Sequence, residues 1–163
     1  MNADAQYQDQ LLSLLDDTVT QAVVFFNGVN GRLFDGHQTA RAVLSHLVFW
    51  HRAYCSISRA LLLESKPTLL RGSLAELNEQ AVCEFQATSM PELADYLSDL
   101  QDELSNNLRR LPDWGVNFPF KMGCRQTDVA GRILSIESHI RHHLTRQERA
   151  HQRGEAWIKA YYP

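Results

Sequence analysis

The chain has 163 residues and a mass of 18.6 kDa, which fits one domain over residues 1–163 and excludes two domains of ordinary size. Lysine and arginine together number 16 against 19 aspartates and glutamates, for a formal net charge of -3. A nucleic-acid-binding domain carries an excess of positive charge, so we expect no nucleic-acid partner. Hydrophobic residues make up 44% and charged residues 21%, as in folded globular domains.

The sequence predicts a cytoplasmic location. Its longest apolar runs, such as residues 23–26 and 61–63, are far shorter than the roughly 20 residues that span a bilayer, so we expect no membrane segment. The first residues have neither the basic nor the apolar stretch of a secretory signal. Cys55, Cys83 and Cys124 match neither a disulfide framework nor C-x-x-C metal spacing, and we expect all three to be reduced.

The first two predicted elements are long amphipathic helices. Apolar residues recur at steps of three and four from about residue 4 to residue 27, the period of one buried helix face, and Asn27-Gly28 ends the pattern. A second helix should begin near Thr39, a residue type that caps helices, and end before Pro67. Its stripe includes Val43, Leu47, Trp50, Tyr54, Ile57 and Leu61.

A third helical region is predicted over residues 73–110, with an interruption or kink at residues 88–91. Two S-x-x-E capping boxes, at Ser73 and Ser89, each mark a helix start. Residues 114–126 contain two glycines and a proline among aromatic residues, and are expected to form an ordered loop over the bundle. Thr127 and Asp128 then cap a long helix to about residue 152, and a short tail helix is predicted after Gly154.

Four long amphipathic segments without alternating strand patterns indicate an all-α fold. The connections allow antiparallel neighbours. We therefore predict an antiparallel four-helix bundle with a short C-terminal helix and almost no strand.

The histidines carry the pattern closest to a functional site. His139 and His143 form H-x-x-x-H on the fourth long helix, so both imidazoles project from one face and can reach one metal ion. His46 lies inside the second helix beside its apolar stripe, and two helices of a bundle can bring such histidines to one point. Three imidazoles with an open position suit zinc, nickel or iron. The alternative is that these histidines are surface or satisfied core residues.

Two segments resemble the DinB/YfiT-like superfamily of four-helix-bundle metal-dependent enzymes. Residues 39–50, TARAVLSHLVFW, are similar to the family's second-helix pattern, which has a capping Ser or Thr, an apolar pair, His-Leu and a Trp four residues after the His. Residues 127–143 resemble the fourth-helix pattern, which ends in H-x-x-x-H. Helix order and length also match over most of the chain.

The resemblance implies a metal triad of His46, His139 and His143, and a divalent metal cofactor whose identity stays open between zinc, nickel and iron. It also implies an enzyme that activates a bound thiol or water, of the thiol-dependent S-transferase or hydrolase type, using a low-molecular-weight thiol or another small molecule. Members are commonly homodimers, and the aromatic tail at residues 157–162 offers apolar surface for one. The alternative function is a non-catalytic interaction or dimerisation protein whose histidines are structural.

Four other residues lie close to these histidines in the sequence. Trp50, one turn after His46, either lines a pocket or belongs to the core. His51 and His142 point to other helix faces and are not expected to be ligands. Glu137 lies too close to His139 along the helix to share its face, which argues against a general-base role. No catalytic residue is assigned.

Overall fold

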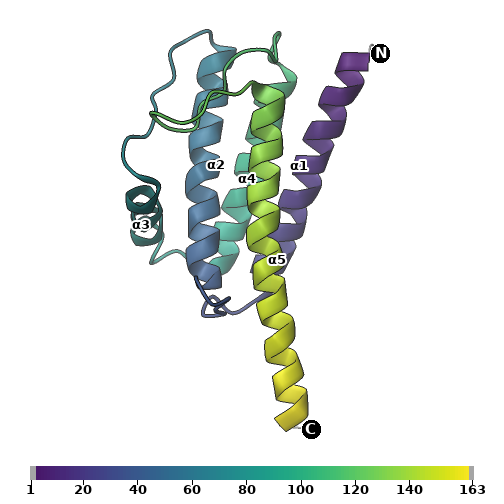
Figure 1. Cartoon of the computed structure of the whole chain (residues 1–163), viewed down its shortest axis with the longest axis vertical. Coiled ribbons are helices and arrows are strands. Elements are labelled where there is room, and N and C mark those ends of the chain that lie inside the picture. Colours follow the sequence, from purple (N-terminus) through teal and green to yellow (C-terminus); the bar gives the residue numbers. More distant parts are fainter. Residues whose placement is uncertain (1–2, 162–163) are drawn as a thin grey trace.

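Residues 3–161 form five helices. The computed structural model describes the backbone of residues 3–161 and the side-chain surroundings of residues 4–154. The helices are α1 (Ala3–Gly28), α2 (Ala40–Leu62), α3 (Leu74–Glu84), α4 (Met90–Arg109) and α5 (Val129–Tyr161) (Figure 1). The only β-type pairing in this part of the chain is one isolated bridge between Phe34 and Thr39. The all-α prediction is confirmed.

Helix starts coincide with the predicted capping residues. Thr39 has an extended backbone before α2, and its side chain accepts a hydrogen bond from a backbone N–H in the first turn. Ser73 with Glu76, and Ser89 with Glu92, form complete capping boxes. Each cap satisfies N–H groups that the start of a helix otherwise leaves without partners. The second box separates α4 from α3, so the predicted interruption is present.

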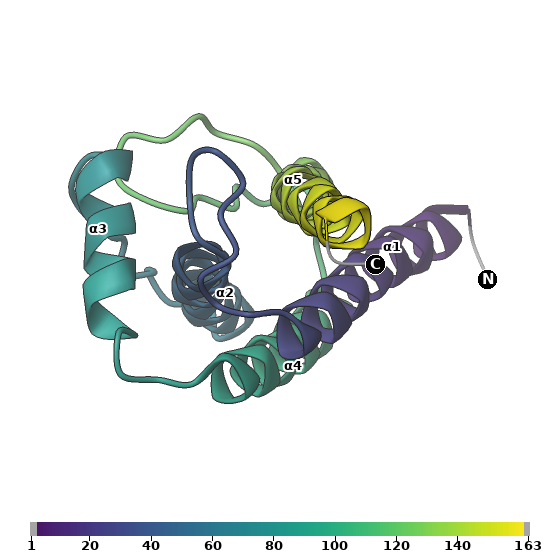
Figure 2. The same ribbon diagram turned by 90° about the horizontal axis from the view of Figure 1, so that it is seen from below.

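The four long helices form the bundle, with α1 and α5 running one way and α2 and α4 the other (Figure 1). Among the helices that pack together, α1/α4 and α2/α5 are antiparallel, as predicted, whereas α1 and α5 run parallel. α2 and α4 run parallel, because α3 and its flanking segments return the chain along the outside of α2 (Figures 1 and 2). The hydrogen bonds between α2 and α4 agree with this direction, because residue numbers increase together along both helices. His51 bonds Gln101, and seven residues later along α2, Ser58 bonds Asn107.

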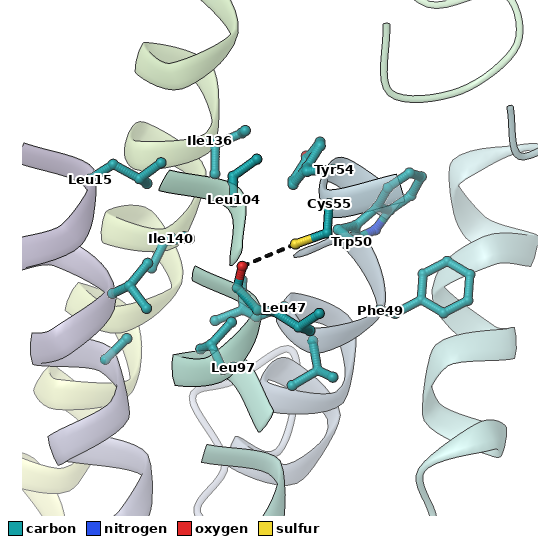
Figure 3. Close-up of a cluster of buried hydrophobic side chains, with 14 of the residues drawn as sticks. Leu15, Leu47, Phe49, Trp50, Tyr54, Cys55, Leu97, Leu104, Ile136 and Ile140 are labelled. Atoms are coloured by element: carbon teal, nitrogen blue, oxygen red, sulfur yellow. Dashed lines mark hydrogen bonds between the residues drawn. The ribbon is translucent and has the colours of Figure 1, made fainter. Parts of the chain in front are cut away.

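The core lies between the long helices. Its buried apolar side chains come from all four and include Leu15, Leu47, Leu97, Leu104, Ile136 and Ile140 (Figure 3). The Cys55 thiol donates a hydrogen bond to the backbone oxygen of Leu100 at 3.0 Å and so joins α2 to α4 (Figure 3). Burial of this continuous apolar cluster supplies the main driving force for folding. All three cysteines are free, as predicted.

The connection between α4 and α5 lies over one end of the bundle (Figure 1). Phe118 is fully buried, and its backbone N–H donates to the carbonyl oxygen of Thr127 at 2.8 Å. The N–H of Met122 donates to the carbonyl oxygen of Leu70 at 2.9 Å, which fastens the connection to the segment before α3. These bonds form the ordered loop that the sequence predicts. Within residues 3–161, no helix has the length and apolar character needed to cross a bilayer.

The prediction of a separate short helix after Gly154 is wrong. α5 continues without a break through Gly154 to Tyr161, and its end projects beyond the other helices (Figure 1). Glycine in a helix interior costs about 1 kcal/mol relative to alanine, but it keeps the backbone hydrogen bond that proline would remove. The apolar surface expected of the tail falls on residues whose side chains lie outside the described part of the structure.

Candidate metal centre

The three predicted histidines meet between α2 and α5. Nε2 of His46 lies 2.9 Å from Nε2 of His139, which in turn lies 3.1 Å from Nε2 of His143. All three nitrogens are within 4.8 Å of one another. His46 is buried, and the other two are half-buried. The four-residue spacing on α5 places His139 and His143 on one face, and the antiparallel α2 presents His46 to that face.

Hydrogen bonding fixes which nitrogen of His46 carries its proton. The indole N–H of Trp50 donates to Oδ1 of Asn78 at 3.0 Å, and since this indole group can only donate, the Asn78 atom is an acceptor. Nδ1 of His46 lies 2.7 Å from the same oxygen and must therefore be the protonated nitrogen. In neutral His46 the lone pair is then on Nε2, which points at the other two imidazoles.

The imidazole cluster fits a divalent metal ion. Zinc–nitrogen bonds of about 2.0 to 2.1 Å in tetrahedral geometry place ligand nitrogens roughly 3.3 Å apart, close to the two short separations found here. Burial, with repulsion from the other histidines, lowers the pKa of His46 to about 3 and that of His143 to about 4. Burial also lowers the pKa of His139. The three rings are thus neutral at pH 7, as ligands must be.

A cavity of about 270 Å³ opens beside the cluster. His46 and His139 form part of its wall, Trp50 and Phe120 meet edge to face with ring centroids 5.5 Å apart, and Arg132 contributes a buried guanidinium. The remaining lining residues are Tyr54, Leu74, Asn78 and Ser135. Trp50 therefore lines a pocket, which was one of its two predicted roles. The cavity gives a small molecule space next to the imidazoles.

The other candidate groups do not belong to the cluster, but the His142 ring lies edge to face with that of His143, with ring centroids 5.8 Å apart. His51 is fully buried on another face of α2 and bonds Oε1 of Gln101 at 2.7 Å. His142 is exposed. Glu137 accepts a hydrogen bond from Thr18 at 2.9 Å and pairs with Arg141, so its carboxylate joins α5 to α1 rather than serving the cavity.

Sequence reasoning missed two polar residues of the site. Asn78 is on α3, whose position beside α2 depends on a crossover with no local sequence signal. Arg132 did have a signal, because it precedes His139 by seven residues and so occupies the same face of α5 two turns earlier. A charged residue in register with an apolar stripe and two candidate ligands indicates a buried functional group.

The family model of the DinB superfamily matches residues 4–145. The chain belongs to the DinB superfamily. Among solved structures, the mycothiol-dependent maleylpyruvate isomerase is similar to this DinB-superfamily chain, with a TM-score of 0.69 and 11% sequence identity. The match covers 86% of this chain and 60% of the isomerase chain, so this chain spans less than two thirds of its length. A search of curated proteins gave no match.

Proposed function

We propose that this DinB-superfamily chain is a metal-dependent enzyme whose ion is held by His46, His139 and His143. Zinc, nickel and iron all suit three imidazoles. The observation that carries the proposal is the convergence of three Nε2 atoms at the wall of a cavity, because a catalytic site keeps a coordination position open to small molecules. A bound ion supplies Lewis acidity that lowers the pKa of a thiol or water in that position.

The chain's own residues define how a substrate is held. Oδ1 of Asn78 accepts a hydrogen bond from the Nδ1–H group of His46 and so keeps Nε2 directed at the cluster. Trp50, Phe120 and Leu74 provide apolar walls against which the apolar part of a substrate can pack. Burial raises the pKa of Tyr54 to about 12, so its hydroxyl stays protonated and can donate a hydrogen bond to a ligand at neutral pH.

The proposed reaction is transfer to a thiol, or hydrolysis, at an electrophilic substrate. The mycothiol-dependent isomerase of similar fold supports the thiol form, as does a cavity with space beside the imidazoles. The second candidate is an interaction protein with structural histidines. A structural zinc site closes its coordination shell with protein ligands. Among the described residues, the cluster that could hold a metal ion contains only three such groups.

Elemental analysis of the purified, untagged chain tests the metal site. We expect about one equivalent of zinc, nickel or iron in the wild type and none in the His46→Ala, His139→Ala, His143→Ala triple variant. His142→Ala is the matched control, because this exposed histidine lies on the same turn of α5 and should leave the metal content unchanged. A wild-type protein that cannot be loaded with any of these metals would exclude the proposal.

A second measurement separates an enzyme from a structural site. In cobalt-substituted protein, the visible spectrum should change when a small thiol or azide enters the open position, and the change should saturate. A spectrum unaffected by either molecule would indicate a closed site and favour the interaction-protein alternative.

We further propose that the chain is a cytoplasmic homodimer. Three free cysteines agree with a reducing compartment. The end of α5 projects beyond the other helices, and its sequence there contains Trp157, Ile158 and Tyr161, of which tryptophan and tyrosine are enriched at protein interfaces. Light scattering should give twice the chain mass for the wild type and the single mass for a Trp157→Asp, Ile158→Asp variant. A monomeric wild type would refute the dimer.

A further inference from the structure

Arg132 is a buried cation in the wall of the cavity. Its side chain is only 5% exposed. Nε donates to the carbonyl oxygen of Phe118 at 2.7 Å and Nη2 to that of Arg125 at 3.3 Å, and the guanidinium lies 4.8 Å from the centre of the Phe120 ring. None of the ion pairs found among the described residues includes Arg132. No aspartate or glutamate is among the residues that line the cavity.

This arrangement leaves a positive charge without a counter-charge. A guanidinium remains charged in proteins, and burying a charge is costly unless it is paired. The two carbonyl oxygens and the aromatic face compensate in part. Neither hydrogen bond uses Nη1, so that part of the donor fork is open to a ligand. An anionic group in the cavity would complete the pairing.

The other polar groups of the cavity favour the same kind of ligand. Oδ1 of Asn78 already serves both Trp50 and His46, which leaves the donor end of its amide for a ligand. Tyr54 and Ser135 add hydroxyl groups that can donate. These donor groups suit a ligand with acceptor oxygens. The apolar part of such a ligand can pack against Trp50 and Phe120.

We propose that Arg132 binds the carboxylate of a small substrate whose apolar body packs against Trp50 and Phe120 and whose reacting end is at the three histidines. The proposed substrate is a small apolar or aromatic carboxylic acid. That this acid reacts at the histidines rests on the proposed function, whereas its binding to Arg132 does not. A planar carboxylate matches the guanidinium fork, and a charge-assisted pair in a desolvated cavity is strong. The cavity volume of about 270 Å³ admits one small molecule.

Arg132 also connects α5 to the loop, so loss of binding in a variant could reflect a disturbed loop. The primary test therefore compares two ligands on the wild-type protein. 3-Phenylpropanoate and its neutral isostere 3-phenylpropanamide have the same shape and differ in charge. By calorimetry on the metal-free full chain, the acid should bind on the order of 10- to 100-fold more tightly than the amide. Equal affinities in the wild type would overturn the proposal without any variant.

Variants then assign the preference to Arg132. Arg132→Gln should abolish the preference for the acid, and Arg132→Lys should retain part of it because it keeps the charge. Arg149→Gln is the control, since it removes the same charge from an exposed position on α5 and should leave the preference intact. A preference that survives Arg132→Gln in folded protein, or is lost in Arg149→Gln, would contradict the assignment. Where Arg132→Gln does not fold, Arg132→Lys and the wild-type comparison decide.

Repeating the titration on zinc-loaded protein separates this inference from the proposed function. An acid preference without any zinc binding would sustain the carboxylate site and refute the metal enzyme. Stoichiometric zinc binding without a preference for the acid would support the metal site and refute the carboxylate site.

Discussion

Asn78 affects the imidazole cluster although it is not one of the three histidines. Its side-chain oxygen accepts hydrogen bonds from both Trp50 and His46. Asn78 offers one oxygen to two donors, and that oxygen decides which nitrogen of the His46 imidazole carries the lone pair. Outer hydrogen-bond partners of this kind orient a ligand and raise its basicity. Asn78 is thus a positioning residue, with an effect that can be measured through metal affinity.

Replacing Asn78 with alanine removes the acceptor and frees the His46 ring to rotate or change tautomer. Zinc affinity, measured by competition with a chromogenic chelator, should fall on the order of 10- to 100-fold. Trp50→Phe keeps the Asn78 contact to His46 and should have a smaller effect. Asn106→Ala makes the same change at an exposed position on α4 and should have none. An unchanged affinity in Asn78→Ala would refute the positioning role.

His51 predicts a pH dependence of folding. Burial lowers its pKa to about 4, so the folded state disfavours the protonated ring that the unfolded chain accepts below pH 6.5. His51 therefore does not reduce the free energy of unfolding above pH 6.5, and it reduces this free energy progressively as the pH falls from 6.5 toward 4. At pH 5 the loss attributable to His51 is about 2 kcal/mol. Urea unfolding of metal-free wild type and His51→Gln at pH 7 and pH 5 should show this difference in slope, and parallel losses would contradict it.

At the scale of elements, α5 carries Arg132, His139 and His143 on one face, so one rigid helix sets the spacing between the proposed carboxylate site and the imidazole cluster. α2 supplies the third imidazole and Trp50 from a capped helix. The loop after α4 adds Phe120 and is held by Arg132 itself. α2 and α5 therefore position the imidazoles and Arg132, α3 adds Asn78, and the loop contributes Phe120 to the cavity wall.

Most helices and the histidine cluster were predictable because their signals are local. Thr39, Ser73 and Ser89 cap the helices that follow them, and a four-residue spacing places two histidines together whatever the fold. Asn78 was not predictable, because its place in the site depends on α3 lying outside α2. The predicted helix break at Gly154 is wrong. A glycine costs a helix interior only about 1 kcal/mol, which is too little to end α5 there.

Gly154 also gives a test at this scale. A Cβ added there meets nothing within 4 Å, so Gly154→Ala should stabilise the end of α5 by about 1 kcal/mol. Amide hydrogen exchange near residue 154 should slow by roughly fivefold. Gly123→Ala is the contrasting variant, because φ of +72° at Gly123 strains any residue with a side chain, and it should lower the melting temperature. No change in exchange would contradict the continuous helix.

For the whole molecule, the imidazole cluster joins two helices that otherwise touch little. α2 packs chiefly against α4, and α1 against α4 and α5, while α2 and α5 make few direct contacts. An ion bound by His46 and by the two histidines of α5 would therefore cross-link the two halves of the bundle. Binding that occurs only in the folded state adds to stability by mass action.

Metal removal should accordingly destabilise the wild type. Free zinc at 100 times its dissociation constant contributes about 2.7 kcal/mol, which corresponds to about 5 to 10 °C in melting temperature for a chain of this size. Calorimetric scans with zinc and with a chelator should differ by this amount in the wild type and in His142→Ala. They should coincide in the triple histidine variant. A zinc-dependent shift in the triple variant would place the ion elsewhere.

The Trp50 hydrogen bond also gives the protein an intrinsic optical reporter. The Trp50 ring lies 6.4 Å from the His46 ring and shares its hydrogen-bond acceptor, so indole emission senses both the polarity of the cavity and the occupancy of the imidazoles. Trp114 and Trp157 also emit, so the contribution of Trp50 is the part lost in Trp50→Phe. A quenching ion such as nickel should dim that part on binding, and a ligand that enters the cavity should shift its wavelength. Substrate screening could then proceed by fluorescence, without a label and before the reaction is known.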